Sequence, residues 1–386
     1  MPRRQQTVKP STGEKARAAE AAPGAAALSV EHMRLLPTSV VGSYSVPEWL
    51  ERLKTDYYQH RMSGTYLQEI HEVAIKAALK DQERAGVDIV SDGELRRDND
   101  VDYFLARVPG IEIPYSAKTY YYDYLDAYVR QPIPEDGRGL GLVDDYRFTS
   151  EYTDHPIKFS FTGPFSLAKR LHNEAYSEEA DLVLALAWVL NREARALAAA
   201  GARLIQIDEP FLAGYPSQVE LAIRAINTVT EGVDVRWAVH ICYGNRYARP
   251  LWEGHYDFLF PAVLDAHVHQ VVLEFARKGY DDLDLFSRYE TPFLLGLGVI
   301  DVKSNDVETA DLVCSRVMRA LRVLPPDRIT VNPDCGLRHL PAAIARAKLE
   351  AMTAGAVLAR DAITGRREAA DLPPARHRPS HQPKRS

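Results

Sequence analysis

Short apolar runs alternate with longer segments of helical periodicity along most of the chain. Eight of these runs predict strands, because they are nearly continuous stretches of apolar residues and show no alternation with polar ones. They cover residues 39–45, 87–94, 157–164, 204–210, 235–243, 269–275, 293–301 and 328–336. Such runs are typical of parallel strands that are covered on both faces.

The intervening segments predict amphipathic helices, each with an apolar stripe at helical spacing. They cover residues 64–86, 178–201, 217–232, 306–324 and 339–361. Gly86 and Gly201 end two of them, as a C-terminal glycine commonly does. Eight strands with crossover helices in about 330 residues predict an α/β fold, the (β/α)8 TIM barrel. We expect this barrel over residues 34–362.

Three segments fall outside the alternation. Residues 1–33 are basic and rich in alanine and proline, without the apolar region of a secretory signal, and predict a disordered extension; a transit peptide is the alternative. Residues 363–386 are basic and proline-rich and predict a disordered tail. The aromatic segment at about 107–157 predicts an insertion with a hairpin that acts as a lid.

Composition narrows the choice of partner and compartment. The 386 residues carry a formal net charge of -6, which argues against nucleic acid or a membrane surface as the main partner. No apolar run reaches about 18 residues, so no segment is predicted to span a bilayer. The three cysteines, Cys242, Cys314 and Cys335, are too few for a disulfide framework and predict free thiols or metal ligands in the cytoplasm.

Polar side chains stand at the ends of the predicted strands. They include Ser43, which follows Gly42, and Asp92, Glu94, Asp208, Glu209, His240, Cys242, Glu274, Asp301, Lys303 and Cys335. In a (β/α)8 barrel the carboxyl ends of all strands meet at one mouth, where active sites lie. We therefore expect side chains from distant parts of the sequence to meet there.

A metal site is one interpretation of these strand ends. His240 and Cys242 stand two residues apart on one strand, so their side chains point to the same face. With Cys335 and Glu274 from two other strands, they form a donor set that suits Zn²⁺ better than a harder cation. A core histidine beside a structural thiol explains the same residues equally well.

Paired carboxylates are the second feature of the strand ends. Asp208 and Glu209 end an otherwise apolar strand, where an unpaired charge is costly. Because neighbouring side chains alternate faces, one is expected at the mouth and the other at an arginine or a helix terminus. Together with Asp92 and Glu94 they could hold the ammonium group of an amino acid, and a structural ion-pair network is the alternative.

Several motifs together resemble one family. "VVGSYS", "SDGELRRDNDVDYF", "FTGP", "IQIDEP", "VHICYGN", the glutamate of "VVLEF", "GLGVIDVKS" and "VNPDCGL" are similar, in this order, to the C-terminal catalytic barrel of cobalamin-independent methionine synthase. The resemblance covers residues of about 37 to 360. The zinc ligands that it implies are His240, Cys242, Glu274 and Cys335. The residues that it implies for homocysteine are Val41, Gly42, Ser43, Glu94 and Asp208, the last two near the ammonium group.

The reaction that the resemblance implies is methyl transfer to the sulfur of homocysteine, which gives methionine. Zinc removes the thiol proton at neutral pH, and the thiolate then attacks an electrophilic carbon. The full-length family enzyme has a second, N-terminal barrel, for which this chain leaves no room. Lys303 stands where the folate-dependent enzymes have a histidine that is associated with protonating the leaving group. We expect Lys303 and Asp301 to be catalytic, with Lys303 as proton donor or as a cation for an anionic group; a solvated surface lysine is the alternative.

Two other functions stay open. Short relatives of this superfamily use methylcobalamin as donor or, as epoxyalkane:coenzyme M transferases, open an epoxide with a zinc-bound thiolate; Arg96 and Arg97 could then face a sulfonate. A non-catalytic barrel with a structural zinc is the other alternative. The expected partners are a small thiol and an alkyl donor, which is methylfolate, methylcobalamin or an epoxide, and a methyl-donor protein is a further partner to consider. Neither nucleic acid nor a membrane is expected.

Overall fold

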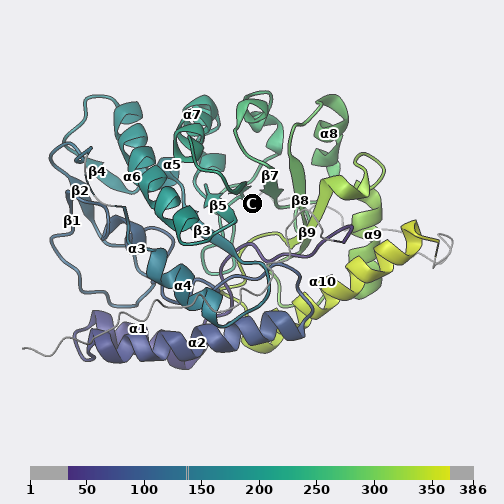
Figure 1. The fold of residues 1–386 in the computed structure, drawn as a ribbon, viewed down its shortest axis with the longest axis horizontal. Coiled ribbons are helices and arrows are strands. Elements are labelled where there is room, and N and C mark those ends of the chain that lie inside the picture. The colour runs from purple at the N-terminus through teal and green to yellow at the C-terminus, as the bar shows by residue number, and fades with distance from the viewer. Residues whose placement is uncertain (1–33, 136, 138, 366–386) are drawn as a thin grey trace, which may run out of the picture.

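A central barrel of parallel strands with helices outside it forms the body of the protein, as Figure 1 shows. The computed structural model describes residues 34–135, 137 and 139–365. The predicted extension at residues 1–33, and the predicted tail apart from residues 363–365, lie outside the described residues. Six strands form one sheet, in the order β3 (Lys158–Thr162), β5 (Leu204–Asp208), β6 (Arg236–Ile241), β7 (Gln270–Leu273), β8 (Leu294–Ile300) and β9 (Ile329–Pro333).

Two short N-terminal segments close this sheet into a barrel. Isolated parallel bridges join Thr38 to Val331 of β9, Ser39 to Ile89, and Val90 to Ile157 beside β3. Residues 38–39 and 89–90 therefore act as the first and second strands. Each of the eight predicted strands thus has a counterpart, and the predicted (β/α)8 fold class is confirmed.

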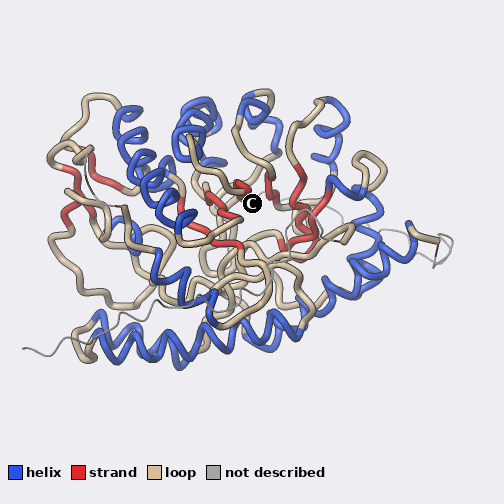
Figure 2. Tube along the Cα trace, in the orientation of Figure 1, coloured by secondary structure: helices blue, strands red, loops and turns tan. Residues whose placement is uncertain are grey.

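The long outer helices agree with the predicted ones. They are α2 (Gly64–Arg84), α6 (Glu179–Ala199), α7 (Val219–Thr230), α9 (Ala310–Ala320) and α10 (Ala342–Ile363). Figure 2 shows helices around the strands of the barrel. The Ser63 hydroxyl caps α2 by accepting a hydrogen bond from Tyr66 N at 3.2 Å. Gly86 and Gly201 follow α2 and α6 with positive φ angles of 79° and 108°, so the predicted helix ends are confirmed.

Shorter helices, which the sequence pattern did not predict, complete the chain. They are α1 (Glu48–Tyr58), α3 (Asp102–Leu105), α4 (Val143–Glu151), α5 (Pro164–Ala168) and α8 (Leu285–Arg288). Single 3-10 turns lie at Leu212–Gly214, Pro216–Gln218, Tyr256–Leu259, Ala262–Asp265, Asp281–Asp284 and Pro326–Arg328. Between β6 and β8 the connections use such turns and α8, because their sequences lack a long run of helical periodicity. None of the helices in the described part of the chain has the length and apolarity of a bilayer-spanning segment.

The predicted insertion contains a hairpin and a helix. Strand β1 (Ile111–Glu112) pairs antiparallel with β2 (Ala127–Val129), and α4 follows. A third strand, β4 (Leu171–Asn173), pairs parallel with β2 and was not predicted. Strand β4 follows β3 in the chain. The small sheet thus lies beside the barrel and joins the insertion to it (Figure 1).

The strands direct one row of polar side chains toward a common side. Thr162 of β3 is in register with Asp208 of β5, which is in register with His240 of β6. Side chains at paired positions of neighbouring strands point to the same face of a sheet. The intervening Ile207 points to the opposite face and belongs to the main apolar core. The barrel therefore presents a carboxylate and an imidazole side by side near its mouth.

Candidate metal and substrate site

The last residues of β6 bring His240 and Cys242 to the mouth of the barrel. Both side chains are buried. His240 Nδ1 lies 3.2 Å from the carbonyl oxygen of Val272 in β7, which holds the ring in place. His240 Nε2 is buried and has no hydrogen-bond partner among the described residues. An imidazole fixed through Nδ1 with a free Nε2 is the usual state of a histidine that binds a metal.

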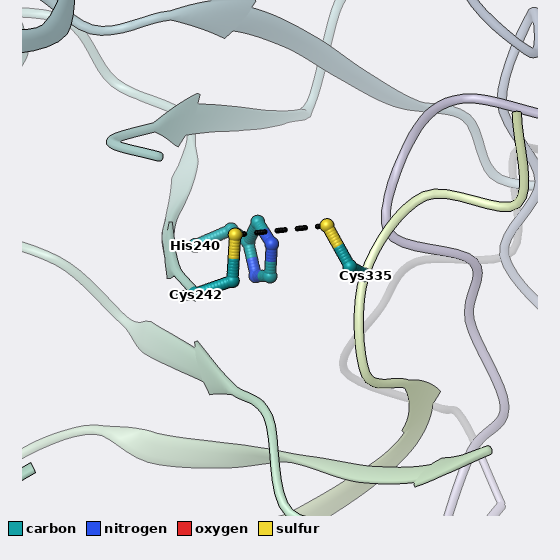
Figure 3. Close-up of side chains that lie close together, drawn as sticks. All are labelled: His240, Cys242 and Cys335. Atoms are coloured by element: carbon teal, nitrogen blue, oxygen red, sulfur yellow. Dashed lines mark hydrogen bonds between the residues drawn. The ribbon is translucent and has the colours of Figure 1, made fainter. Parts of the chain in front are cut away.

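Cys335 follows β9 and meets the β6 pair from the opposite wall, as Figure 3 shows. Its Sγ lies 3.6 Å from Cys242 Sγ, and one donor atom from each of His240, Cys242 and Cys335 lies within 4.8 Å of the other two. Two thiolates bound tetrahedrally to one Zn²⁺ at about 2.3 Å are about 3.8 Å apart. The spacing and the chemistry of the three donors therefore fit a zinc ion.

The surroundings of Cys335 favour its neutral thiol form when no cation is near. Contact with Cys242, together with burial, raises the pKa of Cys335 well above its ordinary value. The two sulfur atoms belong to free cysteines and are not joined as a disulfide. Because a nearby divalent cation reverses such a shift, the pair is better suited to binding a soft metal than to acting as a free nucleophile.

Glu274, the predicted fourth ligand, lies at the end of β7 but outside this three-residue cluster. Its Oε2 accepts a hydrogen bond from Lys303 Nζ at 2.9 Å, and its Oε1 accepts one from Arg277 Nε at 2.7 Å. Burial alone would raise the pKa of Glu274, but the ion pair with Lys303 and the contact with Arg277 lower it. The structure thus places an ionised carboxylate between two cations beside the cluster.

Lys303 and Asp301, the predicted catalytic pair, follow β8. The Lys303 side chain is 4 % exposed, so it is not a solvated surface lysine. Its electrostatic neighbours include both Cys335 and Cys242, and Glu274 raises its pKa although burial opposes this. Asp301 Oδ1 accepts a hydrogen bond from the backbone N of Lys303 at 2.8 Å. Asp301 therefore fixes the turn that directs Lys303 toward Glu274.

A pocket joins the thiol cluster to the predicted substrate residues. The predicted residues that line it are Val41, Ser43, Glu94, Asp208, His240, Cys242 and Cys335. Gly42 lies behind this wall, where a Cβ would overlap the Glu94 carboxylate and approach Ser160 Oγ to 3.0 Å. Gly42, Glu274, Asp301 and Lys303 are not among the pocket residues. The structure therefore brings both predicted halves of the site, metal donors and carboxylates, to one place.

Two carboxylates give the pocket its electrostatic character. Burial, and next the charge of Glu94, raise the pKa of Asp208 to about 7. Glu94 Oε1 accepts from Ser160 Oγ at 2.8 Å and pairs with Arg97 Nη1 at 2.9 Å. A buried carboxylate with a raised pKa gains from a cationic ligand. The neighbouring Glu209 faces the start of α5, where its carboxylate accepts hydrogen bonds from Phe165 N and Ser166 N, so the predicted split of the two acids is confirmed.

Several pocket residues were not predicted from the sequence as substrate residues. They are Asp100, Tyr122, Thr162, Pro210, Asn245, Gly336, Arg338 and His339. Arg97, considered as a sulfonate contact, also lines this pocket, whereas Arg96 pairs with Asp145 and lines another cavity. Arg338 lies three residues after Cys335. A search of the residues that follow each predicted strand would therefore have found it. Tyr122 comes from the insertion, and no sequence signal assigns it to the pocket.

Known proteins are similar to this chain over nearly its whole length. The family model described as the catalytic domain of cobalamin-independent synthase matches residues 36–357. The chain is similar to the methionine synthase of Saccharolobus solfataricus, with 35% identity over 334 residues, which cover 85% of this chain and 96% of that protein. The methionine synthase of Sulfurisphaera tokodaii is 33% identical over 338 residues, which cover 86% and 95%.

A solved structure matches the fold. The B12-independent methionine synthase from Shewanella sp. W3-18-1, solved in complex with selenomethionine, is 28% identical and superposes with a TM-score of 0.75. The match covers 86% of this chain and 100% of that one. The single barrel described above therefore accounts for the entire length of that relative.

Proposed function

Because the chain belongs to the family of cobalamin-independent methionine synthases, over their catalytic domain, we propose that it transfers a methyl group to the sulfur of homocysteine and so forms methionine. Family membership makes the chain a methyltransferase. The observation that carries the proposal is that metal donors and two carboxylates line one pocket. Such a pocket can hold an amino acid by its ammonium group and present its thiol to a metal.

The carboxylates support an amino-acid thiol over a sulfonate thiol. We propose that Glu94 and Asp208 bind the ammonium group of homocysteine, with the turn at Val41, Gly42 and Ser43 beside it. An ammonium between them would favour the ionised form of Asp208. Arg97 at 2.9 Å already balances the charge of Glu94, so Asp208 is the pocket carboxylate that favours an ammonium group over a sulfonate. This disfavours the coenzyme M alternative.

Three residues are the proposed zinc ligands. His240, Cys242 and Cys335 would hold the ion, with Glu274 as a fourth and exchangeable ligand. Zinc bound there would lower the pKa of the substrate thiol, so that the sulfur is a thiolate nucleophile at neutral pH. The donors line a pocket together with substrate residues, which supports a catalytic ion over a structural one. The small number of cysteines, three in 386 residues, also supports the cytoplasm as the compartment.

Lys303 is the proposed catalytic residue that acts on the alkyl donor. Its ammonium group is held by Glu274 at 2.9 Å and has Cys335 and Cys242 among its electrostatic neighbours. We propose that it acts as a proton donor to the leaving group or as a cation for an anionic part of the donor. Asp301 would position it through the backbone hydrogen bond. The alkyl donor is methylfolate, methylcobalamin or, for the rival reaction, an epoxide, supplied free or by a protein partner.

The decisive experiment measures thiol consumption by the purified full chain, loaded with zinc. Homocysteine is offered with methyltetrahydrofolate or methylcobalamin, and coenzyme M with an epoxide, in separate reactions. We expect methionine from homocysteine with one of the two methyl donors. X-ray absorption should show sulfur coordination of zinc rising from two to three when homocysteine is added. Consumption of coenzyme M alone, or no change in coordination with either thiol, would contradict the proposal.

Two cysteine variants make a matched pair for this test. Cys335→Ala should lose bound zinc and reduce methyl transfer by about a hundredfold or more, because only Cys242 and His240 of the cluster remain. Cys314→Ala is the control, because Cys314 lies within α9 in the apolar core and outside the pocket. It should keep one zinc per chain and normal turnover. Full activity of Cys335→Ala would show that the proposed ligand set is wrong.

A further inference from the structure

A buried carboxylate lies behind the turn that carries Lys303. It belongs to Glu308, which stands between β8 and α9 and is 9 % exposed. Glu308 does not line the substrate pocket and lies outside the three-residue metal cluster. Neither the family comparison nor the proposed reaction assigns it a role.

Two cations from the outer helices hold this carboxylate. Lys348 of α10 donates a hydrogen bond from Nζ to Glu308 Oε2 at 2.8 Å, and Arg316 of α9 lies with its Nη1 3.3 Å from Oε1. Arg316 Nη1 also donates to the backbone oxygen of Val299 in β8 at 2.7 Å. Lys348 is 0 % exposed, and a buried charge is costly unless it is paired. The Glu308 carboxylate therefore has a fixed place relative to α9, α10 and β8.

The same carboxylate reaches the turn after β8. Glu308 Oε1 accepts a hydrogen bond from the backbone N of Asp301 at 2.9 Å, and Asp301 Oδ1 accepts one from the backbone N of Lys303 at 2.8 Å. A hydrogen bond with an ionised acceptor is about twice as strong as one between neutral groups. The two carboxylates therefore stabilise the shape of this turn.

The turn sets the direction of the Lys303 side chain, whose Nζ donates to Glu274 Oε2 at 2.9 Å. A series of contacts thus runs from the outer helix α10 to the barrel mouth. It passes from Lys348 to Glu308, then to Asp301, Lys303 and Glu274. A reacting group displaced by about 1 Å can lose about a hundredfold in rate, so the support of Lys303 matters for any role it has in catalysis.

We propose that Glu308 is a positioning residue that holds Lys303 against Glu274 through the turn at Asp301. The effect on catalysis rests on the proposed function of Lys303, whereas the placement of its side chain does not. A carboxylate that only joined α9 to α10 would need its two cations and not the bond to Asp301 N. That bond therefore distinguishes the positioning role from a purely structural one.

Two double variants isolate the bond to Asp301. Glu308→Gln with Lys348→Met removes the ion pair but keeps a side-chain oxygen that can accept from Asp301 N. Glu308→Leu with Lys348→Met removes the ion pair and this oxygen as well. Replacing both members of a buried ion pair by uncharged residues of similar volume is often neutral for stability. The two variants therefore differ mainly in the acceptor for Asp301 N.

The first measurement needs no catalysis. The full chain, loaded with zinc, is methylated on its lysines with formaldehyde and a borane reductant, and the modified residues are located by mass spectrometry. Lys303, whose side chain is 4 % exposed, should react several times faster in the leucine double variant than in the glutamine one, because Glu274 no longer holds it. Lys80, whose side chain is 68 % exposed, is the internal reference and should react equally in both.

The second measurement is the kinetics of methyl transfer to homocysteine. The kcat of the leucine double variant should be about tenfold to a hundredfold lower than that of the glutamine one. The KM for homocysteine should be the same in both, because Glu94 and Asp208 are unaltered. A loss of stability alone would change neither constant in the folded fraction of the chain.

A single variant covers the case in which the leucine double variant does not fold. Glu308→Asp keeps a negative charge near Lys348 but is shorter by one methylene, so it should release Lys303 and speed its methylation relative to the unaltered chain. Equal methylation of Lys303 in the two double variants, or an unaltered rate in Glu308→Asp where only that variant folds, would overturn the proposal.

The two measurements separate this proposal from the proposed function. Faster methylation of Lys303 with equal kcat in the two double variants would support the positioning by Glu308 and count against catalysis by Lys303. Normal turnover in Lys303→Met would count against that catalysis in the same way, and the methylation rates would still decide the role of Glu308.

Discussion

At the scale of single residues, the site depends on the opposite directions of Asp208 and Glu209. Asp208 lines the pocket that contains His240, Cys242 and Cys335, and Glu209 accepts hydrogen bonds from the start of α5. Burial is the first cause that raises the pKa of each to about 7. The two carboxyl groups therefore have similar pKa values but different surroundings, and a variant of one is a control for a variant of the other.

Asp208→Asn should raise the KM for homocysteine by about tenfold to a hundredfold, with a smaller effect on kcat. A hydrogen bond to a charged group contributes about 1.5 to 3 kcal/mol, and the amide cannot supply the negative charge. Steady-state kinetics with varied homocysteine measures this. Glu209→Gln is the matched control and should leave the KM unchanged. An unchanged KM in Asp208→Asn would remove this carboxylate from the ammonium site.

Glu209→Gln should change how stability depends on pH. The pKa of Glu209 is raised from 4.5 to about 7, so the folded state binds its proton more tightly than the unfolded state. The stability associated with this proton is present below pH 4.5 and is lost as the pH rises toward 7. Relative to the unaltered chain, Glu209→Gln should therefore gain about 2 kcal/mol between pH 5 and pH 8. Urea unfolding at both pH values measures the change; a difference that shrinks as pH rises would contradict the assigned pKa.

At the scale of elements, α9 and α10 pack closely because a glycine lies between them. A Cβ at Gly355 of α10 would overlap Val313 of α9 and come within 2.8 Å of the carbonyl oxygen of Ala310. Gly355 is also buried. Glycine lowers helix propensity by about 1 kcal/mol relative to alanine, so its presence in the middle of a 22-residue helix is explained by this approach.

Gly355→Ala should destabilise the protein by about 1 to 2 kcal/mol, because overpacking the contact costs more than the gain in helix propensity. Urea unfolding of the single variant, of Val313→Ala and of the double variant forms a mutant cycle. The overlap with Val313 predicts a favourable coupling of about 1 kcal/mol in the double variant. A stabilised Gly355→Ala would show that the two helices can separate freely.

At the scale of the whole molecule, the shortest strand pairing of the described barrel is at the seam where its two ends meet. Residues 38–39 and 89–90 join the sheet through isolated bridges and not through full strands. Asp88 strengthens this seam, since its Oδ2 accepts hydrogen bonds from Thr38 N at 2.8 Å and from the Thr38 hydroxyl at 2.9 Å. Thr38 is fully buried, so in the folded chain both of its donors depend on Asp88 for an acceptor.

Asp88→Ala should lower the free energy of unfolding by about 2 kcal/mol or more, because it leaves two buried donors of Thr38 without an acceptor. Asp88→Asn keeps an acceptor oxygen and should lose less than half as much. Hydrogen exchange of residues 38–41 and 329–333 should become faster in the alanine variant. Unchanged exchange there would mean that Asp88 does not hold the seam.

The amino-acid sequence alone predicts the fold class, five long helices, the approximate places of the eight barrel strands, and the alternation that separates Asp208 from Glu209. These follow from local rules, since periodicity and strand alternation act over a few residues. The folded structure was needed to show that Glu274 lies between Lys303 and Arg277 and that Arg96 and Arg97 line different cavities. Such contacts join residues far apart in the chain or depend on turns with positive φ, as at Glu94, and no local pattern encodes them.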